Sequence, residues 1–333
     1  MRILITGGTG SLGANLMKHL VRSDDVSAVI CFSRDELKQS NLQSQLLDEP
    51  KARFFIGDVS NLDRLRMAAK DVDVIINTAA MKQVVACEYN PTECIRTNVR
   101  GVENIITVAL EQGISKVLGI STDKAVSPCN IYGASKLVGE KLLTSANNLS
   151  GKNGPCFSSV RYGNVLGSRG SVANVYAEIT RQAVSKNAKP VFPVTDKRMT
   201  RFTITMCDAV DFVLDSLNKM IGGEIFVPKL KSYNIVDFCA AFSREYDLSN
   251  IGMREGERLH EILISRDQGR FAVEFEKGYV LVPDVNFKPK KQYFDYDGEQ
   301  GQPILDDFFL SSDSCEILTV DALEKILVAE GFI

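Results

Sequence analysis

The first half of the chain alternates short apolar runs with longer amphipathic stretches. Apolar runs rich in β-branched and aromatic residues predict strands at residues 2–6, 26–33, 53–59, 72–77, 116–122 and 157–162. Most of these runs lack polar alternation, as expected for strands covered by helices on both faces of a sheet. Strands that alternate with helices of about 10–15 residues are typical of βαβ units. We therefore expect an α/β fold built on a doubly wound, parallel Rossmann sheet.

The pattern becomes irregular after about residue 167. It predicts loops at 167–171 and 190–201, a helix at 208–220, a strand at 224–227, an exposed connection at 288–303 and a final helix at 320–329. We assign residues 1–170 to the Rossmann domain, with a returning segment at about 201–230. We expect residues 171–200 and 231–333 to form a smaller C-terminal lobe.

Composition narrows the class of protein. Of the 333 residues, 39 are Lys or Arg and 42 are Asp or Glu, a balance that gives no basic surface for nucleic acid. Eight cysteines without a C-x-x-C pair and only two histidines argue against a metal site and for a reducing compartment. The sequence shows no signal peptide and no apolar stretch of about 18 residues. We expect a cytoplasmic protein with neither a membrane nor a nucleic acid as partner.

A glycine-rich segment follows the first predicted strand and precedes a helical pattern. Gly7 permits a tight turn, Gly10 allows close approach of a pyrophosphate, and Gly13 allows the helix to pack closely on the strand. The segment therefore predicts a dinucleotide site. Its members are Gly7, Thr9, Gly10, Ser11, Leu12 and Gly13. The alternative is a glycine-rich βα turn that holds no ligand.

The residues about twenty positions after Gly13 bear on which dinucleotide binds. An NAD site usually has an acidic residue there, whereas this chain has Ser33 and Arg34, with Lys38 one helical turn further on. A hydroxyl and cations suit a 2′-phosphate, so we favour NADP over NAD. The alternative is a solvated, charged start of a helix. Asp58 and Val59 end the third predicted strand, where they would contact the adenine, or Asp58 would cap the next helix.

Two short motifs follow the fifth predicted strand. The first ends in Asp123 and Lys124, and the second places Tyr132 and Lys136 four residues apart, on one face of a helix. An ammonium beside a phenol lowers the phenol pKa from about 10, which makes the tyrosine a base for a sugar hydroxyl. A tyrosine and a lysine at this spacing also occur on helices by chance. After a glycine-rich turn the pair becomes a specific signal.

These features resemble the extended branch of the short-chain dehydrogenase/reductase superfamily, with its T-G-x-x-G-x-x-G pattern, over residues 1–170 at least. The resemblance implies a C-terminal lobe that binds substrate. In this branch, sugar-nucleotide 4-epimerases need no acid and base after the threonine. A 4,6-dehydratase needs both, because a base removes the C5 proton while an acid protonates the departing C6 hydroxyl. Asp123 and Lys124 supply one of each. The dTDP-glucose 4,6-dehydratases have Asp-Glu there, so the lysine points to the UDP-N-acetylglucosamine branch.

Further stretches narrow the resemblance over nearly the full length. They are residues 33–40, 53–59, 88–91, 161–165, 167–172, 198–202 and 222–228. They resemble the soluble, inverting UDP-N-acetylglucosamine 4,6-dehydratases that open pseudaminic acid biosynthesis. Many long, membrane-anchored relatives that catalyse the retaining reaction carry methionine where this chain has Tyr132, so the tyrosine favours the inverting family. The alternative is a UDP-N-acetylhexosamine 4-epimerase, and a non-catalytic NADP-sensing regulator is a third hypothesis.

The resemblance implies a role for each residue of the motifs. Asp123 would be the acid for water loss, Lys124 the base and later proton donor at C5, and Tyr132 the base at the 4-hydroxyl. Lys136 would tune the tyrosine, and Thr122 would hydrogen-bond the sugar oxygen at C4. Inversion requires the C5 proton to return on the opposite face, from either the lysine or a water.

The resemblance also implies binding residues and a partner. Besides the turn, Ser33, Arg34, Lys38, Asp58 and Val59, the NADP residues would be Ala79, Lys82, Ser121, Tyr132, Lys136 and Val165. The substrate residues would be Lys82, Asn164, Arg169, Gly170, Ser171, Val172, Thr195 and Arg254. Helices predicted at 102–110 and 137–143 pair between subunits in this superfamily, so we expect a homo-oligomer, a dimer or a hexamer. We assign His260 a structural role.

Overall fold

A computed structural model describes residues 1–151, 153–284, 289–296, 298–304 and 307–333. A ten-stranded sheet runs through the molecule, in the order β18-β14-β15-β10-β6-β5-β4-β1-β2-β3. Its parallel centre consists of β1 (Arg2–Thr6), β2 (Ala28–Ser33), β3 (Ala52–Ile56), β4 (Val74–Asn77), β5 (Lys116–Thr122) and β6 (Cys156–Tyr162). These are the six strands predicted from the apolar runs, and every residue of β2 and β4 is buried.

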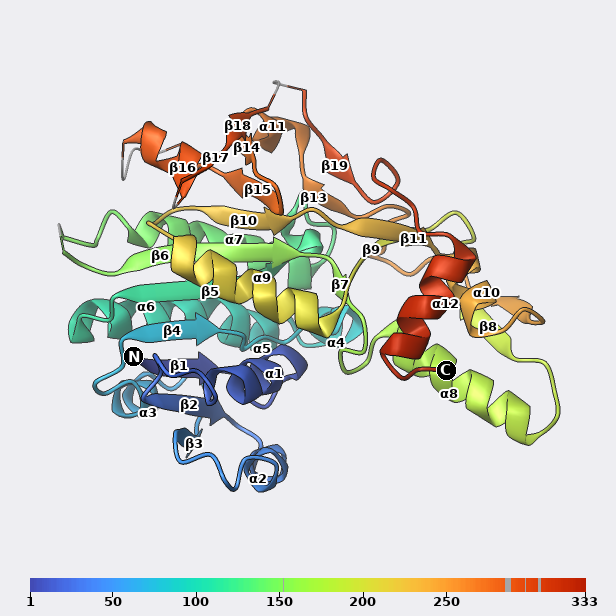
Figure 1. The fold of residues 1–333 in the computed structure, drawn as a ribbon, viewed down its shortest axis with the longest axis horizontal. Helices are drawn as coiled ribbons and strands as arrows, with labels where there is room; N and C mark the ends of the chain where they lie inside the picture. The colour runs from blue at the N-terminus through green and yellow to red at the C-terminus, as the bar shows by residue number, and fades with distance from the viewer. Residues whose placement is uncertain (152, 285–288, 297, 305–306) are drawn as a thin grey trace.

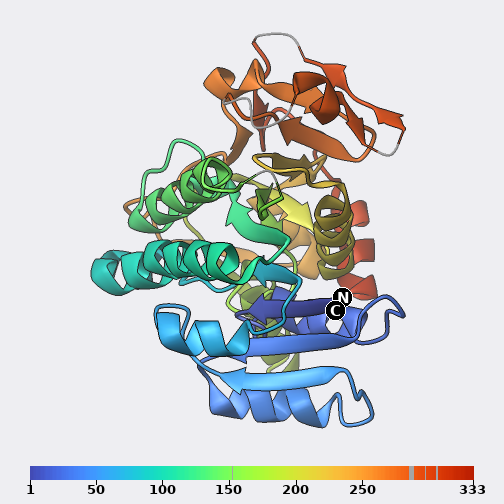
Figure 2. The ribbon, with the colours of Figure 1, turned by 90° about the vertical axis from the view of Figure 1, so that its left-hand side faces the viewer.

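Helices cover both faces of the sheet, which confirms the doubly wound arrangement (Figures 1 and 2). On one face, α1 (Ser11–Leu20), α2 (Glu36–Ser44) and α9 (Met206–Lys219) contribute to a core with Leu16 and Val213 at its centre. On the other face, α3 (Leu62–Ala68), α6 (Gly101–Gln112) and α7 (Ile131–Ala146) pack around Ile105 and Leu143. The helices α4 (Val84–Tyr89) and α5 (Pro91–Ile95) and the π-helix at Arg96–Arg100 lie between β4 and α6 along the chain.

The sheet extends beyond these six strands, first with the strand predicted at 224–227. After a long excursion, β10 (Ile225–Pro228) returns to pair parallel with β6. Three antiparallel strands follow at that edge, β15 (Gly278–Leu281), β14 (Ala272–Glu274) and β18 (Gln302–Pro303). Part of the segment 231–333, which we expected in the lobe, therefore builds the central sheet.

The lobe itself consists of short sheets and helices. The strand pairings are β7 (Asn164–Val165) and β11 (Lys231–Asn234) with β9 (Thr200–Ile204), β8 (Val191–Val194) with β12 (Asp247–Asn250), and β13 (Ile262–Ile264) with β19 (Leu310–Ser311). The helices are α8 (Val172–Ser185), α10 (Ile235–Phe242), α11 (Arg266–Gly269) and α12 (Val320–Ala329). An aromatic core of its own, with Tyr176, Phe192 and Phe238 buried, holds α8, α10, α12 and β8 together at one side of the molecule (Figure 1).

Two segments differ from their predicted conformation. Residues 190–201 contain β8 and the start of β9 rather than only loop. Of the expected exposed connection 288–303, residues 288 and 297 lie outside the described residues. The rest includes a 3-10 helix at Lys290–Phe294, β16 (Asp295–Tyr296) and β17 (Glu299–Gln300). Tyr293 and Tyr296 are only 1% and 4% exposed there, and their buried hydroxyls donate to Gly222 O and Glu224 Oε1.

A buried arginine joins the lobe to the sheet. Arg161 in β6 is fully buried and donates twice to Glu140 of α7, at 2.9 and 2.7 Å. Its Nη1 also donates to Leu263 O at 2.8 Å and to Gln268 Oε1 at 3.0 Å. One guanidinium therefore binds a helix of the Rossmann layer and two segments of the C-terminal half. Among the described helices, none is long and apolar enough to cross a membrane.

Candidate functional site

The glycine-rich turn has the geometry of a dinucleotide site. Gly7 has φ +67°, and a Cβ there would lie 2.7 Å from the Ala79 nitrogen. A Cβ on Gly13 would lie 2.6 Å from Gly7 O, so only glycine allows this packing of turn and helix. Gly10 precedes α1 without a side-chain cap, so the first-turn N–H groups face outward for an anion. These residues fit the pyrophosphate of a nicotinamide dinucleotide.

A cavity of about 380 Å³ lies beside this turn. Its lining is Gly10, Ser11, Ala14, Asn15, Leu166, Gly167, Arg169, Met206, Glu330 and Phe332. The Arg169 backbone nitrogen donates to Ser11 Oγ at 3.0 Å, and its guanidinium donates to Thr9 O. Arg169, which we expected on the substrate, therefore contacts two residues predicted to hold the cofactor. Leu12 of the turn is buried in the core below.

Two cations follow β2: Arg34 comes directly after the strand, and Lys38 lies in the first turn of α2. The Arg34 side chain is 58% exposed and its Nη1 lies 3.4 Å from Asp58 Oδ2, while Lys38 pairs with Asp35 at 2.6 Å. Burial acts to raise the pKa of Asp58, but hydrogen bonds from Ser60 and the charge of Arg34 lower it. Ser33 and Val59 are buried. The cations predicted for a 2′-phosphate are thus exposed on the same side of the sheet.

A cluster of buried, interacting ionisable side chains lies at the C-terminal end of β5. Asp123 begins a 3-10 turn (Asp123–Ala125) directly after Thr122 and is 1% exposed. Its Oδ1 accepts from Thr122 Oγ1 at 2.8 Å and from Lys124 Nζ at 3.0 Å. Its Oδ2 is buried and has no hydrogen-bond partner in the part of the chain that the structure describes. Burial raises the pKa of Asp123 above its ordinary value, against the opposing charge of Lys124. Asp123 is therefore poised to hold a proton on Oδ2.

The ammonium of Lys124 also forms an ion pair with a second carboxylate. Its Nζ lies 3.3 Å from Glu261 Oε1, and Glu261 also lies 3.7 Å from Arg201 Nε. Burial acts to lower the pKa of Lys124, but the charges of Asp123 and Glu261 raise it above its usual range. Sequence reasoning missed Glu261 and Arg201. Arg201 lies in the stretch 198–202 that carries the resemblance, Glu261 follows His260, and no spacing places either beside Lys124.

Tyr132 and Lys136 lie on the buried face of α7, whose first turn is capped by Asn130. Burial raises the pKa of Tyr132 to about 12, against the charge of Lys124 and a hydrogen bond with Thr122, which lower it. Lys136 donates to Ile120 O at 2.6 Å, and burial lowers its pKa to about 8. Lowering of the tyrosine pKa by Lys136 stays a prediction, because the cation that acts on it here is Lys124.

A group of cations faces the start of α8. Lys82 Nζ lies 3.4 Å from Ser168 Oγ, and burial and the charges of Arg169 and Lys124 lower the pKa of Lys82. Ser171 precedes α8 without a side-chain cap, and Val172 begins the helix. Gly170 has φ +75°, and a Cβ there would lie 2.4 Å from Gln83 Nε2. Lys82 and Arg169 thus lie near the uncapped first turn of α8, an arrangement that is typical of anion sites.

The remaining predicted residues are spread over the neighbouring segments. Asn164 in β7 is hydrogen-bonded with Tyr233, and Thr195 donates to Met199 Sδ at 2.9 Å. Arg254 is 56% exposed and lies 3.9 Å from Glu257. Val165 is half-buried beside Asn164, and the Ser121 hydroxyl is buried without a partner among the described residues. His260 Nδ1 lies 2.8 Å from Thr200 Oγ1, in keeping with a structural role.

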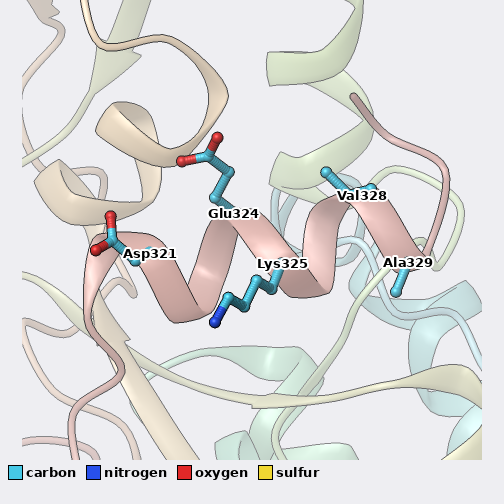
Figure 3. Close-up of a pocket in the computed structure, with 5 residues that line it drawn as sticks. All are labelled: Asp321, Glu324, Lys325, Val328 and Ala329. Atoms are coloured by element: carbon cyan, nitrogen blue, oxygen red, sulfur yellow. The ribbon is translucent and has the colours of Figure 1, made fainter.

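A second pocket, of about 530 Å³, lies along α12 (Figure 3). Its lining comes from that helix alone, namely Asp321, Glu324, Lys325, Val328 and Ala329. Both acids pair with Arg244. This pocket therefore offers no arrangement of groups for catalysis.

Comparison with known proteins agrees with this geometry. Residues 3–283 match the family model described as polysaccharide biosynthesis protein. The chain belongs to the polysaccharide biosynthesis protein family. A relative in Campylobacter jejuni named UDP-N-acetylglucosamine 4,6-dehydratase (inverting) is 45% identical, over 99% of this chain and 98% of its own. A Rickettsia akari relative named UDP-glucose 4-epimerase is 34% identical, over 99% and 96%. Among solved structures, Pen from Bacillus thuringiensis superposes on this polysaccharide biosynthesis protein with a TM-score of 0.89 at 30% identity, covering 100% of this chain and 98% of Pen.

Proposed function

We propose that this chain is an inverting, NADP-dependent UDP-N-acetylglucosamine 4,6-dehydratase, a hydro-lyase. The observation that carries the proposal is the buried contact between Asp123 and Lys124 beside Tyr132, with one carboxylate oxygen of Asp123 unpartnered among the described residues. The identity of 45% to a relative named for this activity supports it. The product would be UDP-2-acetamido-2,6-dideoxy-β-L-arabino-hex-4-ulose, which opens pseudaminic acid biosynthesis.

A bound nicotinamide would supply the hydride chemistry for oxidation at C4 and reduction at C6. The turn from Gly7 to Gly13 would hold its pyrophosphate, and Arg34 and Lys38 its 2′-phosphate. Tyr132 accepts the proton of the 4-hydroxyl, while Thr122 binds the oxygen at C4.

The ion pair of Asp123 and Lys124 differs from a neutral carboxylic acid and a neutral amine only in the position of one proton. When Asp123 carries a proton on Oδ2 and Lys124 has given one up, a carboxylic acid and a neutral amine stand side by side. The amine then takes the proton from C5, and the C–H electron pair forms the C5–C6 double bond. The C6–O bond breaks, and its oxygen takes the proton from Asp123 and leaves as water. The pair returns to its ionic form.

The cation group at α8 fits the diphosphate of the substrate. Lys82 and the guanidinium of Arg169 match phosphate oxygens, and the first turn of α8 from Ser171 and Val172 adds N–H donors. Asn164, Gly170, Thr195 and Arg254 would complete the substrate contacts. A mobile lysine or a water would return the proton to the opposite face of C5.

We also propose a cytoplasmic homo-oligomer. The segment from α4 to α7 carries exposed apolar side chains, among them Val85, Tyr89, Ile95 and Val138. Their exposure on α4, α5 and α7 supports an interface between copies, in which the family resemblance would include α6.

A 4-epimerase is the second candidate, favoured by the relatives named UDP-glucose 4-epimerase. Such an enzyme needs Tyr132, Lys136 and the dinucleotide, but leaves the Asp123–Lys124 pair without a role. The test is NMR of UDP-N-acetylglucosamine incubated with the protein in deuterated water. A 4-keto-6-deoxy product with deuterium at C5 and the L-arabino configuration supports the dehydratase. Formation of UDP-N-acetylgalactosamine instead would refute it.

A further inference from the structure

Glu261 is a buried carboxylate that reaches the proposed catalytic lysine from a distant part of the chain. It directly precedes β13 and is 4% exposed. Its Oε1 lies 3.3 Å from Lys124 Nζ. Its backbone is held on both sides by Ser312, whose hydroxyl accepts from Glu261 N at 2.9 Å and whose nitrogen donates to Glu261 O at 2.9 Å. The carboxylate is therefore a fixed partner for the ammonium.

Lys124 thus has two anchors on separate elements. Asp123 Oδ1 lies 3.0 Å from Nζ on the side of β5, and Glu261 holds it from the lobe. A neutral amine has two N–H donors and one lone pair. With both N–H groups donated to these two oxygens, the lone pair is left for a third direction. The unpartnered Oδ2 of Asp123 stays available for the acid role.

Arg201 allows Glu261 to remain charged when Lys124 is neutral. Its Nε lies 3.7 Å from Glu261 Oε1, and its Nη1 donates to Thr200 O at 2.7 Å and Leu259 O at 3.0 Å. Burial acts to raise the pKa of Glu261, but the charges of Lys124, Arg201 and Arg258 lower it. A proton that leaves Lys124 for Asp123 therefore does not strand an unpaired buried carboxylate.

We propose that Glu261 is a positioning residue that aims the amine of Lys124 at the substrate C5 proton, with Arg201 as its charge partner. The inference rests on the proposed dehydratase function. It predicts that Glu261 acts on proton transfer at C5 and leaves substrate binding nearly unchanged. The charged and titratable groups that face Lys124 are Asp123, Glu261, Arg201, Tyr132, Tyr233 and Lys82.

The first measurement compares wild type with Glu261→Gln on UDP-N-acetylglucosamine and on the same substrate deuterated at C5. We expect kcat to fall between about tenfold and a hundredfold, as for a misplaced catalytic group. KM should change by less than about twofold, and the isotope effect at C5 should rise because proton abstraction becomes slower. Glu261→Asp should recover part of kcat, because it retains the charge.

The second measurement needs neither cofactor nor substrate. An amine-reactive reagent modifies only neutral lysine, and mass spectrometry of the Lys124 peptide gives the pH at which labelling begins. Loss of the Glu261 charge lowers the lysine pKa, so Glu261→Gln should be labelled at lower pH than wild type. The control is Glu224→Gln, another buried carboxylate, which bonds Ser158 and the backbone of Ile221 and Gly222. It should leave the isotope effect and the labelling curve as in wild type.

The outcomes separate the two proposals. An unchanged isotope effect and an unchanged labelling curve in Glu261→Gln overturn the positioning role, even when wild type makes the 4-keto-6-deoxy sugar. If Glu261→Gln does not fold, the same two readouts on Glu261→Asp decide. Wild type that makes UDP-N-acetylgalactosamine and shows no isotope effect at C5 refutes the dehydratase. In that case a shifted labelling curve still reports the contact between Glu261 and Lys124.

Discussion

Burial of the Lys136 ammonium should destabilise the protein in the absence of cofactor. Lys136 is 8% exposed, and burial lowers its pKa from 10.5 to about 8. At about 1.4 kcal/mol for each tenfold change, this fall corresponds to about 3 kcal/mol. The unfolded chain binds its proton more tightly than the folded one, so stability rises with pH between about 8 and 10.5. Near neutral pH the full penalty is present.

Lys136→Met removes the charge and keeps most of the apolar chain. It also removes the hydrogen bond to Ile120 O, a loss of about 1 kcal/mol. We therefore expect the free energy of unfolding to rise by about 2 kcal/mol near pH 7 and not at all near pH 10. Urea unfolding of cofactor-free protein at both pH values measures this difference. Activity should be lost, because a substitution that stabilises a functional site commonly removes a group that the function needs.

Lys116→Met is a matched control on β5, the strand whose Ile120 O accepts from Lys136. Lys116 also donates to backbone carbonyls, Leu217 O at 2.8 Å and Asn218 O at 3.1 Å, but it is only half-buried. Its replacement should lower stability at both pH values. The reasoning is refuted if Lys136→Met is no more stable than wild type near pH 7, or if its advantage persists unchanged near pH 10.

The other expected outcomes concern the core, the turn and the cofactor. Glu140→Gln leaves the buried Arg161 uncompensated and should lower the free energy of unfolding by about 3–5 kcal/mol in urea, whereas the double variant Glu140→Leu/Arg161→Met should recover most of it. Equal losses in the two would contradict this. Gly13→Ala forces a Cβ to within 2.6 Å of Gly7 O and should weaken dinucleotide binding by at least about tenfold in calorimetric titration. Arg34→Ala should reduce affinity for NADP relative to NAD by about 1.5–3 kcal/mol, and an unchanged ratio would exclude a role in selectivity.

Hydrophobic patterns along the chain predicted the central strands and the main helices. The strands β1 and β5 and the helix α12 have the predicted bounds, because each is an apolar or amphipathic run flanked by clear stop signals. The short strands β14 and β15 were not predicted. Each has three or four residues, and each is stabilised by pairing with a partner far away in the chain. The polar composition around Tyr293 and Tyr296 likewise led to the prediction of an exposed connection, although both side chains are buried.

In the candidate site, too, residues close in sequence were predicted and residues brought together by tertiary contacts were not. Asp123, Lys124 and Tyr132 lie close in sequence, and the structure brings them together at the end of β5. Glu261 reaches Lys124 only through the pairing of β13 with β19 and the contact of the lobe with the 3-10 turn. The contacts of Arg169 with Thr9 and Ser11 join segments about 160 residues apart. No local spacing carries such tertiary information.

The position of Arg161 has a consequence for how such enzymes diversify. Its guanidinium donates to both carboxylate oxygens of Glu140 from the Rossmann layer and to Leu263 O and Gln268 Oε1 from the C-terminal half. A C-terminal half acquired from a relative by recombination would fit only if it offered two oxygens at the same place. Substrate specificity can therefore change most easily in the surrounding loops. The positions whose oxygens bind Arg161 are constrained.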